Sequence, residues 1–348
     1  MSQTELERLR AEIDEQPEVV QRLLDRQLQP VREVARSIQQ RDPAAVVLVA
    51  RGSSDNAAVY GRYLLEVCNR RLTSLAAPSG LTLYGRGPRL DRTVVIGVSQ
   101  SGQGEDVIAY VREARAQGAA TVALVNDEAS PLAETAEWVL ACLAGPELSI
   151  PATKTVIAQM TLLAMLSSVL EDGIAALMGL PEALHLALQQ REAAAHLAKS
   201  LAATTVGSVI GRGFAFPPAL EIALKLKETS YTRAEPFSAA DFLHGPMALV
   251  EPGYSALVVD VGGRSSEAAV DLAQTIQQRG GQPALLRAGD ASPPRADLPN
   301  LSLAVSVGEP YAPIVVLVLG QLFAVEFALA RGLDPARPRG LRKVTSTR

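Results

Sequence analysis

Two serines and an amide directly follow an apolar stretch, in an arrangement that suits phosphate binding. Ser99-Gln-Ser-Gly102 ends the run Thr93-Val-Val-Ile-Gly-Val98, and a helix-like segment, 105–115, comes next. A buried strand therefore leads into a hydroxyl-rich turn that opens a helix, where backbone N–H groups and the helix dipole favour an anion. Gly102 lets the backbone approach a ligand closely. The turn predicts a phosphate cradle without a lysine; a plain serine-capped turn is the alternative.

A second group of candidate residues lies on one predicted helix that begins at Pro217. Glu221, Lys225 and Glu228 are spaced at i, i+4 and i+7, so their side chains share one face. Their neighbours are mostly apolar, as on a buried helix. A carboxylate in an apolar pocket has a raised pKa, and it can then both take and return a proton. An exposed stripe of ion pairs is the alternative interpretation of this spacing.

Two further residues are weak candidates when each is taken alone. His244 lies in a loop fixed by Gly245-Pro246, where packing at a loop corner is the commoner role of a histidine. Lys343 lies in the C-terminal tail, where lysines are usually solvated. Neither residue predicts a catalytic function by itself.

The elements that would position these residues alternate between apolar runs and helix-like stretches. Four apolar runs in each half show little polar alternation, as expected of parallel strands covered by helices on both faces. Val47-Leu-Val-Ala-Arg-Gly52 returns as Ser208-Val-Ile-Gly-Arg-Gly213, and later segments repeat at nearly the same spacing. The sequence therefore predicts an α/β fold with two tandem, doubly wound, flavodoxin-like parallel sheets.

Ligands of such sheets bind beyond the carboxyl ends of the strands. The loops at 52–54, 99–101 and 149–153 fall there, and because we expect all three in the first half, one pocket would use them all. In the second half, the segment 262–266 (Gly-Gly-Arg-Ser-Ser) takes the position of the serine cradle. We interpret it as a relic of a duplication, with a second weak anion site as the alternative.

We expect five segments along the chain. The first, 1–42, is helical and broken at Pro17 and Pro30, and the tail, 334–348, cannot be helical through its prolines. The others are a first sheet domain at 43–180, a linking helix at 181–202 and a second sheet domain at 203–333.

Composition excludes several classes of protein. Of the 348 residues, 48% are hydrophobic and 20% charged, which is typical of a globular protein, and a net charge of -4 argues against nonspecific nucleic-acid binding. No apolar run approaches the length of a membrane span, and the N-terminus has no signal-peptide core, so a cytoplasmic protein without a membrane partner is expected. Cys68 and Cys142 are predicted to be buried thiols, and the three histidines lack metal-ligand spacing.

Four motifs, taken together, resemble the sugar-isomerase (SIS) family and the isomerase half of glucosamine-6-phosphate synthase, also called glutamine–fructose-6-phosphate aminotransferase. They are Ser99-Gln-Ser-Gly102, Ala223-Leu-Lys-Leu-Lys-Glu228, His244-Gly-Pro-Met-Ala-Leu249 and Pro338-Arg-Gly-Leu-Arg-Lys-Val-Thr345. They occur in the family's order. Arg51-Gly-Ser-Ser-Asp-Asn56 and Ala152-Thr-Lys154 also match the stand-alone members that act as glucosamine-6-phosphate deaminases.

The resemblance implies a set of substrate-binding residues in the loops of the first half. They are Gly52, Ser53, Ser54, Ser99, Gln100, Ser101, Gly104, Ile150 and Ala152. Where the synthase pattern continues Ser-Gly-Glu-Thr, this chain has Ser101-Gly-Gln-Gly104. One phosphate-binding hydroxyl is therefore missing, and the backbone N–H of Gly104 is expected to replace it.

The resemblance also implies catalytic roles and a homodimer. Glu228 would move a proton between C1 and C2 of the sugar, and Lys225 would help to set its charge. His244 would open the sugar ring from the neighbouring subunit, so each active site would be shared between two subunits. No cofactor and no metal is implied.

Lys343 falls on the family's lysine that forms a Schiff base with the open-chain sugar. Desolvation and the nearby cations Lys225, Arg339 and Arg342 would favour the neutral amine, which is the nucleophilic form. The chain departs from the family pattern after Lys343, so the closing role of the tail is less well supported than the lysine.

The synthase carries a separate amidotransferase half with an N-terminal cysteine nucleophile, and this sequence, which starts Met1-Ser2, contains no such half. The favoured function is therefore conversion of glucosamine 6-phosphate to fructose 6-phosphate and ammonia. The alternatives are a fructosamine-6-phosphate deglycase, a synthase-like isomerase that uses free ammonia, and a non-catalytic sugar-phosphate sensor. The sensor is disfavoured because the short, acidic N-terminal helices do not resemble a DNA-binding motif, and because Glu228, His244 and Lys343 are present together.

Overall fold

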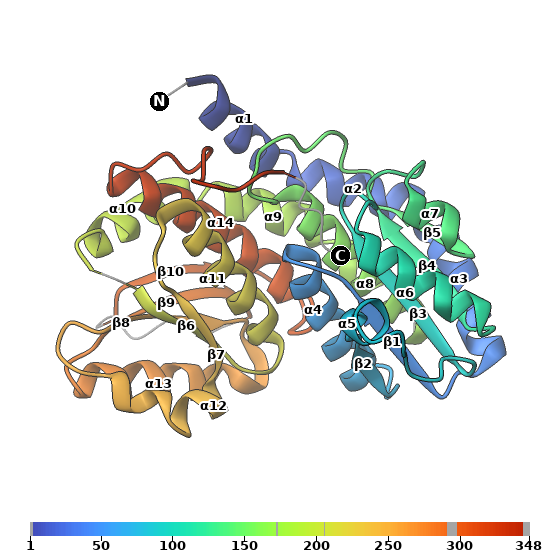
Figure 1. Ribbon diagram of the computed structural model, residues 1–348. Helices are drawn as coiled ribbons and strands as arrows, with labels where there is room; N and C mark the ends of the chain where they lie inside the picture. Colours follow the sequence, from blue (N-terminus) through green and yellow to red (C-terminus); the bar gives the residue numbers. More distant parts are fainter. Residues whose placement is uncertain (1–2, 172, 205, 291–297, 344–348) are drawn as a thin grey trace. The chain divides into compact units, whose positions relative to one another are not determined.

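The computed structural model describes residues 3–171, 173–204, 206–290 and 298–343 (Figure 1). They form two compact units, each built around one sheet. The first-sheet unit comprises Glu18–Glu147, Lys154–Met178 and the tail from Arg342. The second-sheet unit comprises the chain up to Pro17, Leu148–Thr153 and Gly179–Leu341.

The first sheet has five parallel strands in the order β2-β1-β3-β4-β5. They are β1 (Ala45–Val49), β2 (Thr73–Leu75), β3 (Thr93–Ser99), β4 (Ala120–Val125) and β5 (Trp138–Ala141). This is the flavodoxin-like order, in which the winding reverses between β1 and β3 and ligands bind at that point. The loops after β1 and β3 therefore meet where a ligand is expected.

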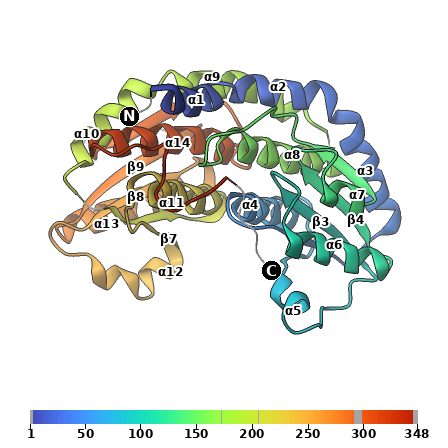
Figure 2. The ribbon, with the colours of Figure 1, turned by 45° about the horizontal axis from the view of Figure 1, so that its top comes forward.

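Helices cover both faces of this sheet, which explains why its strands are apolar throughout. One face carries α5 (Pro78–Thr82), α6 (Glu105–Ala116) and α7 (Pro131–Thr135). The other carries α3 (Leu28–Arg41), α4 (Ser53–Val67) and α8 (Lys154–Glu171) (Figure 2). Val94, Val95 and Ile96 are consecutive in β3 and all are fully buried.

The second sheet repeats the first, with the order β10-β9-β8-β6-β7. Its strands are β6 (Val206–Gly211), β7 (Glu235–Ser238), β8 (Ser255–Asp260), β9 (Gln282–Gly289) and β10 (Asn300–Ala304). One face carries α12 (Ala239–Leu243) and α13 (Ser266–Gln278), and the other carries α10 (Arg191–Leu201), α11 (Phe216–Ser230) and α14 (Ala312–Ala330) (Figure 2).

The remaining helices are short or lie at the start of the chain. They are α1 (Gln3–Asp14), α2 (Gln16–Arg26), α9 (Leu180–Leu188) and the 3₁₀ turns η1 (Ala175–Leu177), η2 (Gly213–Ala215), η3 (Pro246–Leu249) and η4 (Gly263–Ser265). The predicted linking helix is thus two helices, α9 and α10, which are separated at Gln189 and Gln190.

The two tandem, doubly wound parallel sheets predicted from the sequence are confirmed, and so is the internal repeat. The structure has five strands in each half where four were predicted. The additional strands, β2 and β7, are short edge strands, and Pro236 in β7 is tolerated there because an edge strand need not donate every ladder hydrogen bond. Their length gives them too little hydrophobic pattern to detect.

The expectation that no apolar run approaches the length of a membrane span is wrong for two helices. Both α8 and α14 are long and apolar enough to cross a membrane by length and composition, although none was expected from the sequence. Both helices are mostly buried inside the fold. In the second-sheet unit α14 packs against α10, α11 and β9, which is the position of a core helix.

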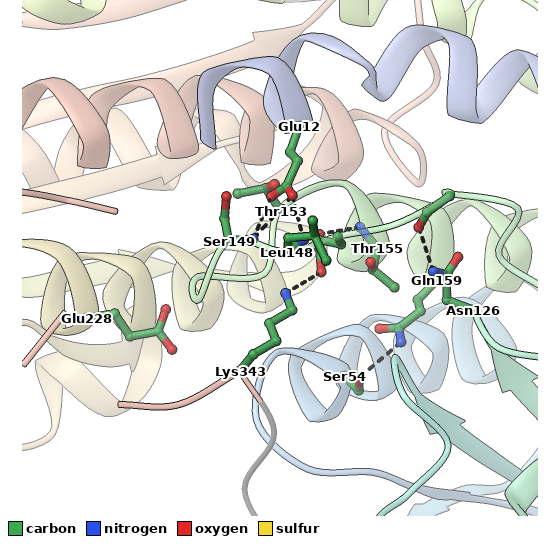
Figure 3. A network of polar contacts seen from close by, with 12 residues as sticks. Glu12, Ser54, Asn126, Leu148, Ser149, Thr153, Thr155, Gln159, Glu228 and Lys343 are labelled. Carbon is green, nitrogen blue, oxygen red and sulfur yellow. Dashed lines mark hydrogen bonds and ion pairs between the residues drawn. The ribbon is translucent and has the colours of Figure 1, made fainter. Parts of the chain in front are cut away.

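The loop 148–153 also differs from the prediction, because it groups with the second-sheet unit and not with the first half. The Glu12 carboxylate, which is buried, accepts hydrogen bonds from the backbone N–H groups of Leu148 (2.6 Å) and Ser149 (3.2 Å) (Figure 3). The Gln321 amide donates to the Thr153 carbonyl at 3.2 Å. Partners distant in sequence therefore determine where this loop belongs.

Candidate active site

The serine cradle has the strand–turn–helix context that the sequence predicted. Ser99 is the last residue of β3 and α6 begins at Glu105. Gly102 has φ +63°, and a Cβ there would clash with Ser130, so this turn requires glycine. The Ser99 Oγ accepts the backbone N–H of Gly102 at 3.0 Å, and the Ser101 Oγ accepts that of Gln103 at 3.3 Å. Each hydroxyl is half-buried and keeps its hydrogen for donation to a ligand.

The loop after β1 contributes a second hydroxyl group to the same end of the sheet. Gly52, with φ +60°, precedes α4, and Ser54 lies in the first turn of that helix. The buried Gln159 amide of α8 donates to the Ser54 Oγ at 3.0 Å (Figure 3). Gln159 was missed by the sequence analysis because its only signal is this contact, between positions 105 residues apart.

Gly104 stands at the N-cap of α6 with an ordinary extended backbone, φ -65° and ψ 109°. A Cβ at this position would meet no atom closer than 3.6 Å, so a Cβ would fit. The missing hydroxyl is therefore a property of the sequence, and no steric constraint of the fold excludes it.

The carboxylates and lysine of α11 form a buried ion-pair group. The Lys225 Nζ lies 2.6 Å from the Glu228 Oε2 and 3.3 Å from the Glu221 Oε1. The side chains of Glu221 and Lys225 are 1% and 3% exposed, which rules out an exposed stripe, whereas Glu228 is 19% exposed. Burial lowers the pKa of Lys225, but the attraction of Glu221 and Glu228 outweighs burial and raises it above its usual value. Lys225 is therefore a fixed cation beside Glu228.

A cavity of about 10 Å³ lies against Lys225 in the second-sheet unit, lined also by Thr153, Thr229 and Gln321. It has room for about one water molecule and none for a sugar. It is a packing defect beside the ion pair, not a substrate pocket.

His244 is exposed directly after α12, where its backbone N–H donates to the Asp241 carbonyl at 3.1 Å. The neighbouring side chains Leu243 and Leu249 are each 56% exposed. The exposure of His244 rules out the packed position at a loop corner that was the alternative for this residue.

Lys343 reaches a buried carboxylate within the first-sheet unit. Its Nζ lies 2.9 Å from the Glu147 Oε2, and the Glu147 side chain is 0% exposed (Figure 3). The Glu147 Oε1 accepts the backbone N–H of Thr155 at 3.0 Å. The sequence analysis named only cationic neighbours for Lys343 and did not identify Glu147, which lies 196 positions away.

The predicted site residues are divided between the two units. The first-sheet unit holds Gly52, Ser53, Ser54, Ser99, Gln100, Ser101, Gly104 and Lys343. The second-sheet unit holds Ile150, Ala152, Lys225, Glu228 and His244. Ile150 and Ala152 are half-buried in the loop that groups with the second sheet.

The second-half counterpart of the cradle is filled by the protein's own carboxylates. The Glu309 Oε2 accepts the backbone N–H of Arg264 at 3.1 Å, and this carboxylate occupies the space next to Gly263. The Asp260 Oδ1 accepts the N–H of Gly262 at 2.9 Å, and its Oδ2 lies 3.2 Å from the Arg287 Nε. An added anion would be repelled here, which favours the relic interpretation.

Within the described ranges, no group of three or more His, Cys, Asp and Glu side chains is arranged to hold a metal ion. Both cysteines are free thiols; Cys142 is buried as predicted, but Cys68 is only half-buried. Burial raises the pKa of Cys142, and the charge of Glu147 adds to that rise. Cys142 is therefore a poor nucleophile.

Both halves of the chain match the model of one known protein domain. The SIS domain model matches residues 41–168 and 208–331. The glutamine–fructose-6-phosphate aminotransferase of Thermococcus kodakarensis is 34% identical over 348 aligned residues, which cover 95% of this chain and 56% of that protein. The corresponding protein of Methanothermobacter thermautotrophicus is 32% identical with the same coverage. The chain thus spans about half the length of the curated relatives it matches.

Solved structures give the same picture. A candidate phosphosugar isomerase from Silicibacter pomeroyi has a TM-score of 0.85 and 36% identity, over 94% of this chain and 99% of that one. A glucosamine-6-phosphate deaminase from Thermotoga maritima has a TM-score of 0.76 and 20% identity, over 98% and 100% of the two chains. At that identity the likeness shows the fold alone.

Proposed function

Because this chain belongs to the SIS domain family, we propose that it is an enzyme that releases ammonia from an aminosugar 6-phosphate. The net reaction converts glucosamine 6-phosphate and one water to fructose 6-phosphate and ammonia. The observation that carries the proposal is the pairing of Glu228 with the buried Lys225 at 2.6 Å. It provides a carboxylate that has a fixed cation beside it and is still 19% exposed.

The proton transfer is assigned to Glu228. In the open-chain sugar, Glu228 takes the proton from C2 and returns it to C1. The C1 aldehyde thereby becomes an alcohol, and C2, which carries the amine, becomes an imine. One carboxylate on one face of the sugar suffices for both steps. The buried Lys225 ammonium lies 2.6 Å from this carboxylate and is a fixed positive charge beside it.

Release of ammonia is assigned to Lys343. Its amine adds to the C2 imine and displaces ammonia, which leaves a lysine Schiff base, and water then hydrolyses that bond to release fructose 6-phosphate. The amine must lose its proton before it attacks. The Glu147 carboxylate, 2.9 Å away, is placed to accept that proton.

The phosphate is assigned to the loops after β1 and β3. The hydroxyls of Ser54, Ser99 and Ser101 and the start of α6 lie at the point where the winding of the sheet reverses. These hydroxyls and backbone N–H groups supply neutral hydrogen-bond donors to the phosphate.

The homodimer is part of the same proposal. His244 is exposed, which leaves its imidazole accessible to complete the site of a partner subunit. During ring opening, His244 would take the proton from the C1 hydroxyl and return it to the ring oxygen as the bond between C1 and that oxygen breaks. We also propose that the enzyme is cytoplasmic.

The test is ammonia release by the purified chain from glucosamine 6-phosphate, with formation of fructose 6-phosphate measured in parallel. We expect equal amounts of both products and loss of both in Glu228→Gln. A panel with fructosamine 6-phosphate distinguishes a deglycase. No ammonia from any of these substrates, at concentrations where they bind, would overturn the proposal.

A second candidate is a synthase-like isomerase, favoured by the names of the relatives that are 32% and 34% identical. It would run the same chemistry toward glucosamine 6-phosphate. Incubation of fructose 6-phosphate with ammonium at several concentrations separates the two, because the ratio of forward to reverse rates at matched saturation differs between a deaminase and a synthase.

A further inference from the structure

Arg51 lies at the ligand-binding end of the first sheet. It follows β1 by two residues, and β1 pairs with β3 in a register that matches Val49 with Gly97. Arg51 lies two residues beyond Val49, and Ser99 lies two residues beyond Gly97. Arg51 therefore lies between the two loops of the cradle, at the point where the winding of the sheet reverses.

The guanidinium of Arg51 is anchored at one nitrogen only. Its Nε donates to the Asp106 Oδ2 at 2.6 Å, and Asp106 is buried in the first turn of α6. The Arg51 side chain itself is 51% exposed. In the part of the chain that the structure describes, its two terminal nitrogens form no other hydrogen bond. A guanidinium carries five N–H donors, so four remain for a ligand in a fixed fork geometry.

The charges around the cradle create a need for a cation. Asp55 and Asp106 both lie in the first turn of a helix that points at the site, where each carboxylate would repel a phosphate dianion. Burial raises the pKa of Asp55, and the charge of Arg51 offsets part of that rise, which places Arg51 close to Asp55 as well. The serines and backbone N–H groups supply no charge to balance these carboxylates.

We propose that Arg51 is the cationic ligand of the substrate phosphate, held in place by Asp106 and compensating for the hydroxyl that is absent at Gly104. The proposal rests on the proposed function, since it assumes that a phosphate monoester binds at the cradle. It adds a charged, bidentate contact to a site that the sequence presented as neutral. The two serines then orient a phosphate that Arg51 attracts.

The competing role for Arg51 is to neutralise Asp106 without touching the ligand. A double-mutant cycle separates the two roles. Arg51→Gln, Asp106→Asn and the double variant are compared with wild type by calorimetric binding of fructose 6-phosphate and of inorganic phosphate. Arg112→Gln is the matched control, because Arg112 is an exposed arginine farther along α6.

If Arg51 binds the phosphate, Arg51→Gln weakens binding about 10- to 100-fold, the range for a hydrogen bond to a charged group. The double variant then stays as weak as Arg51→Gln, and Arg112→Gln binds like wild type. If Arg51 only neutralises Asp106, the double variant regains wild-type affinity, which overturns the proposal. Unchanged affinity in Arg51→Gln overturns it too.

Two further measurements distinguish a loss of phosphate binding from a loss of folding and a loss of charge from a loss of the fork geometry. Thermal unfolding of each variant identifies any loss of folding, and Arg51→Lys, which keeps the charge but not the fork, is expected to recover only part of the affinity. If wild type itself binds neither fructose 6-phosphate nor inorganic phosphate, the proposed function fails together with the role of Arg51. If wild type binds and Arg51→Gln binds equally well, only the role of Arg51 fails.

Discussion

Lys343 forms an ion pair with Glu147 at 2.9 Å, although 196 positions separate them in the sequence. The carboxylate is buried, and its second oxygen is held by the N–H of Thr155 at the start of α8. A lysine in the C-terminal tail thus has a fixed partner in the first-sheet unit. The pair connects the final stretch of the chain to the loop that follows β5.

We predict that Glu147→Gln lowers the rate of ammonia release about 100-fold or more, because the general base that takes the proton from Lys343 is lost. Glutamine can still accept the N–H of Thr155, so the loop keeps its shape. Borohydride trapping with fructose 6-phosphate, read by mass spectrometry at Lys343, should fall in parallel.

The control for this prediction is Glu137→Gln, which removes a carboxylate paired with Arg41 at the surface. It should leave rate and trapping unchanged. Full trapping in Glu147→Gln would show that Lys343 loses its proton by another route.

Replacing both Ser99 and Ser101 by alanine removes two neutral donors from the cradle. Hydrogen bonds to charged groups contribute about 1.5–3 kcal/mol each, so we expect fructose 6-phosphate to bind at least tenfold more weakly by calorimetry. Ser200→Ala is a matched control, because that residue is exposed on α10 of the second-sheet unit, where its hydroxyl donates to the Leu197 carbonyl. Unchanged binding in the double alanine variant would remove the cradle from the site.

Glu228→Gln preserves the shape of the side chain and removes the base. General acid–base catalysis is typically worth about 10²–10⁴ in rate, so turnover should fall by that factor while the affinity for fructose 6-phosphate changes little. In heavy water, the wild type should place deuterium at C1 or C2 of recovered sugar. Exchange at the wild-type rate in Glu228→Gln would assign the proton transfer to another residue.

Gly104→Thr should tighten phosphate binding. The backbone at Gly104 has φ -65°, which any residue adopts, and an added Cβ meets nothing closer than 3.6 Å. One new hydroxyl at the start of α6 should strengthen binding of fructose 6-phosphate about tenfold. Gly104→Ala controls for the backbone change; if threonine binds no more tightly than alanine, the hydroxyl does not reach the phosphate.

Mixing the inactive variants His244→Ala and Glu228→Gln should restore part of the activity if each site takes its histidine from the partner subunit. One hybrid site then carries both wild-type residues. Exchange of subunits is verified with differently tagged chains. A monomer in light scattering, or no recovery after verified exchange, would contradict a shared site.

The sheets and the cradle were accessible from the sequence because their signals are local. Runs such as 93–98 are apolar on both faces, and a serine followed by glycine and a helix is a pattern of a few residues. The buried group on α11 was visible for the same reason, since Glu221, Lys225 and Glu228 share one helix face.

Contacts between distant segments were not accessible. Glu147 has the same appearance in the sequence as any loop carboxylate until Lys343 lies beside it. The placement of the loop 148–153 depends on Glu12, more than 130 positions earlier, which no local pattern reports. Pairing of this kind is decided by tertiary packing, and propensity carries no information about it.

The Glu309 carboxylate at the start of η4 has a consequence for how the two halves respond to metabolite levels. A carboxylate attached to the chain cannot dissociate, so the N–H of Arg264 keeps its partner whether or not sugar phosphate is present. The matching turn at Ser99–Gly102, on the proposed function, takes its anion from solution. The two helix starts share one ancestry, but the anion at the start of η4 is always present. The anion bound at Ser99–Gly102 varies with substrate concentration, and its binding adds to the stability of the folded protein.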